Sequence, residues 1–284
     1  MQPDVSLTSR GLNLLGMMHL PSCLLMGFAV VLGEAIASPI VTAQAAFIGF
    51  MTGFLLLGAH MVLDDLDREI NSDNEPTRIR PVGVVKRNEA FSFAIMLASF
   101  GLLFAAYLGL STLLIALLSA VLIFVHHAKT RKPDVLGNAF VGANTAIIFI
   151  YAGFAVGSLT RMLAIFVVMA FLSSMGRETM KNLAQSLKDS SVRAVSVTGS
   201  NRYTEAGKQS ALLFVATVMV SVVPMVLRLV SINYIPLIVI CDVGFLLTAY
   251  SMMTSPTPRN AKRNENYVLV WLSFGLFAFV IGTL

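Results

Sequence analysis

Long apolar runs separated by short polar segments make up most of the chain. A helix that crosses a bilayer needs about 20 predominantly apolar residues, so each run predicts one membrane-spanning helix. The uncharged stretch from Ala90 to Val125 is too long for one crossing, and we therefore expect a break around Gly109. The predicted spans are Leu14–Leu32, Ala43–Leu63, Ala90–Tyr107, Ser111–Val125, Asn138–Gly157, Met162–Met175, Ser210–Leu227, Tyr234–Met253 and Tyr267–Leu284. The pattern predicts an all-α, polytopic membrane protein with nine transmembrane helices.

The composition supports this interpretation and excludes a water-soluble enzyme. Of the 284 residues, 56% are hydrophobic and only 12% are charged, whereas a soluble domain carries about 25% charged residues. Nine spans leave no room for a sizeable soluble domain, so we expect one membrane-embedded domain over residues 1–284. Cys23 and Cys241 fall inside apolar runs, where they predict small buried side chains and not a disulfide or a metal pair.

The basic residues are distributed asymmetrically between the two sides of the predicted bundle. All 20 Lys and Arg residues except Arg161 and Arg228 lie in the N-terminal segment or in the segments that follow the second, fourth, sixth and eighth spans. By the positive-inside rule, the N-terminus and these loops are expected to be cytoplasmic. The net charge of +5 is spread over short loops and forms no single patch, so no nucleic-acid partner is expected.

A first acidic cluster, DDLDREINSDNEPTRIRP, directly follows the second span. Asp64, Asp67 and Asn71 are spaced i, i+3 and i+7, which places them on one helical face if the helix continues past Leu63. Oxygen ligands of this kind suit Mg²⁺, which is usually held by one or two carboxylates together with substrate phosphates. Asp65 points elsewhere and is expected only to solvate the helix end.

A second cluster, GRETMKNLAQSLKDS, follows the sixth span. Asn182, Gln185 and Asp189 repeat the i, i+3, i+7 spacing, although polar helix ends at an interface could also produce it by chance. Because the clusters occupy corresponding positions, we expect two parallel halves, about 14–132 and 138–263. Facing clusters would then enclose a central cavity that opens to the cytoplasmic side.

Three stretches of the chain resemble a known family: DREINSDNEPTRIRP after the second span, HHAKTRKPDVLGN after the fourth, and GRETMKN after the sixth. The whole chain resembles the UbiA-type intramembrane prenyltransferases, and the third stretch is most similar to the archaeal branch that makes digeranylgeranylglyceryl phosphate. The resemblance implies nine transmembrane helices and two aspartate-rich motifs that bind Mg²⁺ and a prenyl diphosphate.

The resemblance also assigns site residues, with several departures from the family pattern. It implies metal ligands at Asp64, Asp67, Asn71, Asn182, Gln185 and Asp189, with Asp64, Asp67 and Asp189 as the catalytic carboxylates. The family usually has aspartates where this chain has Asn71, Asn182 and Gln185, and asparagines where it has Leu63 and Ser22. An amide oxygen can ligate Mg²⁺ but brings no negative charge, so we expect weakened metal affinity.

Prenyl transfer also requires cations near the diphosphate, because negative charge develops on this leaving group as its bond to the allylic carbon breaks. The candidate diphosphate ligands are Arg80, Lys129, Arg131, Lys132, Arg177 and Lys181. Each of these residues could instead serve only to orient the protein in the membrane.

A few polar residues stand apart from the clusters. Asp242 and Asn144 lie within predicted spans, where ionisable and polar side chains are functional candidates, although Asn144 more simply predicts an interhelical hydrogen bond. His60, His126 and His127 have no Cys or Glu at a fitting distance and make no zinc motif.

Three functions compete on this evidence. The leading one is a Mg²⁺-dependent membrane prenyltransferase that moves a long isoprenoid, such as geranylgeranyl, from its diphosphate to a lipid-soluble acceptor such as geranylgeranylglyceryl phosphate. The second is a UbiA-like scaffold whose degenerate aspartate motifs bind an isoprenoid or a partner without catalysis. The third is a secondary transporter, which is disfavoured because transport sites lie near the membrane midplane and these acidic residues do not. The acceptor, the donor chain length and the oligomeric state stay open.

Overall fold

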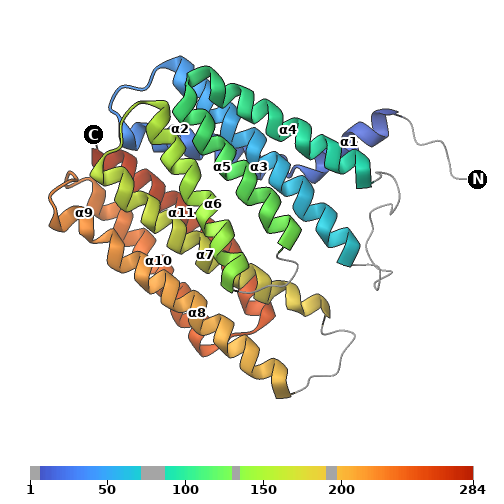
Figure 1. Cartoon of the computed structure of the whole chain (residues 1–284). Coiled ribbons are helices and arrows are strands. Elements are labelled where there is room, and N and C mark those ends of the chain that lie inside the picture. Colours follow the sequence, from blue (N-terminus) through green and yellow to red (C-terminus); the bar gives the residue numbers. More distant parts are fainter. Residues whose placement is uncertain (1–6, 72–86, 130–134, 190–196, 284) are drawn as a thin grey trace, which may run out of the picture.

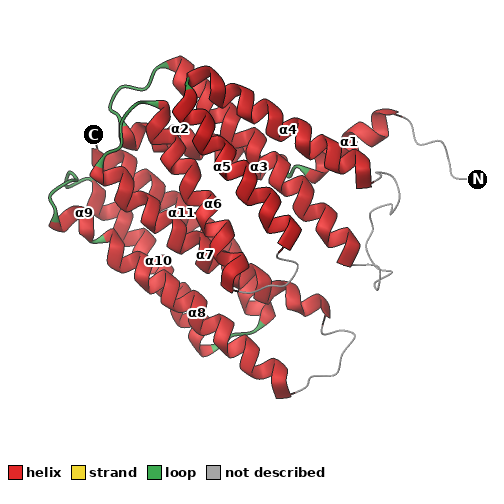
Figure 2. Cartoon of the chain, viewed as in Figure 1, coloured by secondary structure: helices red, strands yellow, loops and turns green. Residues whose placement is uncertain are grey.

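The computed structural model describes residues 7–71, 87–129, 135–189 and 197–283, and all regular structure in these ranges is helical (Figure 2). This confirms the predicted all-α class. The helices, labelled in Figure 1, are α1 (Leu7–Met17), α2 (Leu20–Ala37), α3 (Ala43–Asn71), α4 (Arg87–Leu108), α5 (Leu110–Lys129), α6 (Val135–Ala155), α7 (Arg161–Asp189), α8 (Val197–Ser221), α9 (Val223–Val226), α10 (Tyr234–Thr254) and α11 (Pro258–Thr283).

The long helices suit a bilayer. Within the described ranges, eight helices are long and apolar enough to cross a membrane, and a ninth apolar segment, Leu110–His126, lies within α5. Large apolar side chains face outward along them, including Phe28 at 59% exposure, Leu103 at 65% and Met253 at 61%. Such surfaces would be costly in water but are stable in lipid. The helical bundle therefore belongs to an integral, multi-pass membrane protein.

The first span differs from its predicted position at Leu14–Leu32. Two helices, α1 and α2, share this region, and His19 between them has a left-handed backbone with φ of 50°. Pro21 lies in the first turn of α2 and has no N–H to continue the α1 ladder, so the chain breaks there. The span consequently begins at Leu20 and extends to Ala37, which brings Glu34 inside it.

The predicted break at Gly109 is confirmed. Helix α4 ends at Leu108 and α5 begins at Leu110, with Gly109 at φ of +142°, a conformation that side-chain-bearing residues rarely adopt. The Thr112 hydroxyl donates a hydrogen bond to the Ala105 carbonyl oxygen at 2.7 Å across this turn. The predicted single run Ser210–Leu227 is instead interrupted between α8 and the short α9, because Pro224 in the first turn of α9 has no N–H to continue the α8 ladder.

Helix packing creates two apolar cores joined by α2 and α6. One core is formed mainly by α1 to α5, and the other mainly by α7, α8, α10 and α11, with Ile36 of α2 and Phe149 of α6 also buried in the second. The C-terminal ends of α3, α5 and α7 lie at the same end of the bundle in Figure 1. Whether the two halves are related repeats stays a prediction.

Candidate active site

Helices α3 and α7 bring the two predicted motif regions together. Helix α3 continues past Leu63 to Asn71, as the i, i+3, i+7 pattern requires, and α7 continues past Met175 to Asp189. Lys181 of α7 lies with its Nζ 3.7 Å from Oδ2 of Asp64 of α3 and 3.2 Å from Oε1 of Glu178. One predicted diphosphate ligand is thus beside one predicted metal ligand, with a second carboxylate that sequence analysis had not singled out.

Amide side chains extend this cluster to α6. Asn182 donates a hydrogen bond from Nδ2 to Oδ1 of Asn138 at 2.6 Å, and Asn138 donates from Nδ2 to the Thr179 hydroxyl oxygen at 3.0 Å. Asn138 and Thr179 are buried, whereas Asn182 is half-buried. The predicted metal ligand Asn182 is therefore held by Asn138, which is held in turn by Thr179, and neither of these two residues had an assigned role.

Arg177, another predicted diphosphate ligand, contacts a different helix from Lys181. Its Nη2 lies 3.7 Å from Oε1 of Glu265 in α11, and Lys262 donates to the other oxygen of this carboxylate at 2.8 Å. The Nε atom of Arg177 is buried and has no hydrogen-bond partner in the described part of the chain. Arg177 thus ties α7 to α11, and its contact with a diphosphate stays a prediction.

Asp65 does not merely solvate the end of α3, as we had expected. It is buried, and its Oδ1 lies 3.6 Å from Nε2 of His19, the residue at the α1–α2 break. The pair therefore fixes the start of α2 against the end of α3.

The remaining predicted ligands fall where side chains are not described. Helical backbone continues through Asp67, Asn71, Lys129, Gln185 and Asp189, but their side chains lie outside the described part of the structure, and Arg80, Arg131 and Lys132 lie outside it altogether. Their roles stay predictions.

The donor types near Asp64 fit Mg²⁺ better than a soft metal. The Asp64 carboxylate and the Asn182 amide supply oxygen, the ligand that Mg²⁺ prefers. Among described residues no three His, Cys, Asp or Glu side chains gather to hold a metal. The rings of His60 and His126 lie with their centroids 6.2 Å apart.

Some polar side chains within the spans form hydrogen bonds to a neighbouring helix. Ser119 of α5 donates to Oδ1 of Asn144 of α6 at 2.6 Å, which confirms the predicted interhelical hydrogen bond. Asp242 of α10 receives a hydrogen bond from Ser221 at 2.7 Å. Glu34 of α2 was missed: it is fully buried, and neither carboxylate oxygen has a partner within the described ranges.

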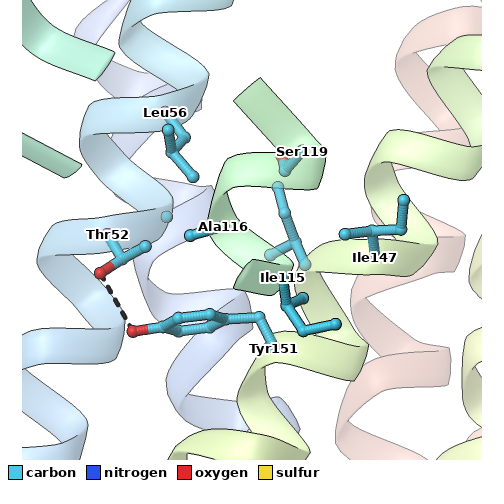
Figure 3. Close-up of a pocket in the computed structure, with 9 residues that line it drawn as sticks. Thr52, Leu56, Ile115, Ala116, Ser119, Ile147 and Tyr151 are labelled. Atoms are coloured by element: carbon cyan, nitrogen blue, oxygen red, sulfur yellow. Dashed lines mark hydrogen bonds between the residues drawn. The ribbon is translucent and has the colours of Figure 1, made fainter. Parts of the chain in front are cut away.

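A small apolar cavity lies deeper in the bundle, between α3, α5 and α6 (Figure 3). Its walls include Leu56, Ile115 and Ile147, and Tyr151 and Thr52 point toward each other with their hydroxyl oxygens 3.1 Å apart. Twelve residues of α3 separate Asp64 from Thr52, which at 1.5 Å per residue corresponds to about 18 Å along the helix. The polar cluster and the cavity therefore share one helix at two depths.

Fold and site together define a polytopic membrane protein with a polar cluster at one end of its helical bundle. The UbiA prenyltransferase family matches residues 21–280. The chain belongs to this family, and it is a prenyltransferase.

Curated relatives support this assignment, and solved structures share the fold. The chain is 26% identical to the digeranylgeranylglyceryl phosphate synthase of Methanocaldococcus jannaschii, over 95% of each chain, and 27% identical to that of Methanosarcina mazei, over 94% of this chain and 97% of the relative. A solved structure concerning digeranylgeranylglyceryl phosphate synthase in membranes superimposes with a TM-score of 0.76 at 24% identity, over 96% of this chain and 98% of the other. A UbiA homologue from Archaeoglobus fulgidus bound to GPP and Mg²⁺ gives a TM-score of 0.61 at 15% identity, over 94% and 97% of the two chains.

Proposed function

We propose that this protein transfers a geranylgeranyl group from geranylgeranyl diphosphate to geranylgeranylglyceryl phosphate. In this reaction the bond between the allylic carbon and a diphosphate oxygen breaks, and a new carbon–oxygen bond forms to the acceptor hydroxyl. Diphosphate leaves with the bonding electron pair, and the acceptor hydroxyl loses its proton. Support comes from the similarity to digeranylgeranylglyceryl phosphate synthases along nearly the whole chain.

The contact between Lys181 and Asp64 is the observation that carries the proposal. It joins α3 and α7 within the two polar segments that follow the second and sixth spans. A cation held between two carboxylates is well placed to contact a diphosphate while remaining fixed in orientation. A protein that only bound an isoprenoid chain would have no need of this charged cluster.

The oxygen-rich donor set also suits a Mg²⁺ ion shared with the diphosphate. Asp64 and Asn182 would hold it, together with Asp67, Asn71, Gln185 and Asp189 on the same helical faces. Mg²⁺, when bound, supplies positive charge that stabilises the leaving diphosphate. Similar structures bound to GPP with Mg²⁺ and to DMAPP with Mg²⁺ support this cofactor.

Basic residues would bind the remaining diphosphate oxygens. Lys181 and Arg177 are the described members of this set, and they lie one turn apart on α7. Lys129 would approach from the end of α5, Arg80 from the segment that follows α3, and Arg131 and Lys132 from the segment that follows α5. These cations hold the leaving group, while the apolar bundle keeps water from the carbocation-like prenyl carbon.

The prenyl chain would extend from the cluster into the bundle along α3. The cavity beside Leu56 and Ala116 has a volume of only about 10 Å³, so its apolar walls would have to move apart to admit the chain at that depth. The hydrogen-bonded pair Thr52 and Tyr151 would close its far side. Both the donor and the acceptor would enter from the lipid phase, with their phosphates at the cytoplasmic surface.

The test is an acceptor screen with purified protein in detergent. Radiolabelled geranylgeranyl diphosphate is incubated with geranylgeranylglyceryl phosphate, quinone precursors or no acceptor, each with Mg²⁺ or EDTA. We expect Mg²⁺-dependent labelled product with geranylgeranylglyceryl phosphate. Product with a different acceptor would replace the proposed substrate, and absence of any product would favour the non-catalytic scaffold.

A further inference from the structure

A chain of three side-chain hydrogen bonds links α6 to α7 at the polar cluster. It runs from the Met175 backbone carbonyl through Thr179 and Asn138 to Asn182, with donor–acceptor distances of 2.9, 3.0 and 2.6 Å. Gly142, one turn further along α6, makes this approach possible, because an added Cβ there would lie 2.9 Å from the Phe171 carbonyl oxygen. The close helix contact thus brings Asn138 within reach of α7.

The direction of these hydrogen bonds is fixed at one end. The Met175 carbonyl oxygen can only accept, so the Thr179 hydroxyl donates its single hydrogen to it. The Thr179 oxygen then accepts the hydrogen bond from Asn138. Asn138 therefore turns its NH₂ group toward Thr179 and its oxygen toward Asn182. Asn182 must therefore donate from its NH₂ group to the Asn138 oxygen, and its own amide oxygen stays available.

This order makes residue 182 a hydrogen-bond donor, a role that an ionised aspartate cannot fill. The asparagine at this motif position is thus matched to Asn138. In the part of the chain that the structure describes, the Asn182 side chain makes this one hydrogen bond, and its oxygen takes part in none.

We infer that Asn138 and Thr179 are positioning residues that orient Asn182 so that its amide oxygen, and not its nitrogen, faces a bound Mg²⁺. The inference rests on the proposed function, because it requires metal binding at the α3–α7 cluster. Without the two residues, the Asn182 amide can rotate and turn its NH₂ group toward the cation. The partial positive charge of the NH₂ hydrogens then repels the cation.

Metal affinity, measured apart from turnover, tests this inference. Mn²⁺ binding to the full-length protein in detergent is titrated by electron paramagnetic resonance in the presence of inorganic pyrophosphate. Loss of a residue that orients a metal ligand typically weakens metal affinity by about 10–100-fold. We expect Asn138→Leu to weaken Mn²⁺ binding by about tenfold or more, and Thr179→Val to weaken it in the same direction.

Two controls separate orientation from packing. Thr179→Ser keeps the hydroxyl and should bind Mn²⁺ within about twofold of wild type. Thr145→Val removes a hydroxyl that donates to the Val141 carbonyl oxygen within α6, and it should leave Mn²⁺ affinity unchanged. The thermal midpoint of each variant without metal reports whether the fold is kept. If Asn138→Leu does not fold, the comparison of Thr179→Val with Thr179→Ser tests the positioning role by itself.

Each outcome bears on a separate statement. Wild-type affinity in Thr179→Val and in folded Asn138→Leu overturns the positioning role, as does a Thr179→Ser defect equal to that of Thr179→Val. If the wild-type protein itself shows no saturable Mn²⁺ binding with pyrophosphate, the proposed metal-dependent function is overturned and the inference with it.

Discussion

At the scale of single residues, ion pairs at the polar cluster fix the position of the Lys181 side chain. Lys181 lies between Asp64 and Glu178, so its ammonium group is held in place at a site that is only partly exposed. An arrangement of this kind holds a cation at the cluster while avoiding an isolated buried charge. The proposed role of Lys181 is to bind the diphosphate of the donor.

Replacing Lys181 with Gln should weaken donor binding. A hydrogen bond to a charged group contributes about 1.5–3 kcal/mol, so the KM for geranylgeranyl diphosphate should rise by about tenfold or more. Steady-state kinetics measure this change. Lys208→Gln, at an exposed position of α8, serves as the matched control, and equal KM values in both variants would remove Lys181 from the donor site.

Asn182→Asp should affect metal affinity and stability in opposite directions. The added carboxylate attracts Mg²⁺ more strongly, so the Mg²⁺ concentration for half-maximal rate should fall. The same carboxylate would face the Oδ1 atom of Asn138, and two acceptors cannot form a hydrogen bond. If Asn138 turns its NH₂ group to residue 182 instead, the Thr179 hydroxyl must donate to Asn138 and gives up its hydrogen bond to the Met175 carbonyl oxygen. The loss of one hydrogen bond lowers the free energy of unfolding by about 1 kcal/mol. Metal titration and thermal denaturation check the two signs, and unchanged Mg²⁺ dependence would argue against ligation by residue 182.

Sequence spacing predicted part of this site. Asp64 and Asn182 followed from helical periodicity, since residues at i, i+3 and i+7 share a face whatever the helix packs against. Asn138, Thr179 and the His19–Asp65 pair could not be found in this way, because their contacts depend on which helices are neighbours and at what register. Glu34 was missed because the apolar run was ended at Leu32, before the carboxylate.

At the scale of helices, apolar runs located the spans but not the ends of the helices. Charged segments at the ends of α3 and α7 and at the beginnings of α8 and α11 remain helical beyond the apolar region. Hydropathy cannot detect such extensions, because a polar helix turn and a polar loop have similar composition. Pro21 and Gly109 did mark real breaks, but only the second was predicted.

Close packing between α2 and α3 depends on Gly49. A Cβ atom added there would collide with the Glu34 carboxylate, which is fully buried with no hydrogen-bond partner in the described ranges. Gly49→Ala should therefore lower the thermal midpoint, because two helices must separate or a buried carboxylate must move. Gly16→Ala, which meets open space, should raise helix stability by up to about 1 kcal/mol. Equal midpoints for the two variants would contradict the packing described.

At the scale of the whole molecule, the arrangement of spans and basic residues predicts orientation in the membrane. The polar cluster and the basic segments are proposed to face the cytoplasm, with Arg161 and Arg228 on the other side. Cys23 and Cys241 are buried, so they should contribute little background to thiol labelling.

Cysteine labelling in intact cells and inverted vesicles tests this orientation. A cysteine introduced at Ser200 should react with a membrane-impermeant thiol reagent only from the cytoplasmic side, and one at Ser158 only from the outside. Their opposite labelling would support an odd number of spans between the measured sites. Labelling of both positions from one side would contradict the proposed topology.

The most direct test of the account is Mg²⁺-dependent product formation at the α3–α7 cluster. Purified wild-type protein, Asp64→Asn and the exposed control Glu205→Gln are incubated with geranylgeranyl diphosphate and geranylgeranylglyceryl phosphate, and labelled product is quantified with Mg²⁺ and with EDTA. We predict product from wild type and Glu205→Gln only when Mg²⁺ is present, with a rate at least about a hundredfold lower in Asp64→Asn, as expected when a directly acting charge is lost. Equal rates in wild type and Asp64→Asn, or equal rates with Mg²⁺ and with EDTA, would contradict the assignment of this cluster as the site of prenyl transfer.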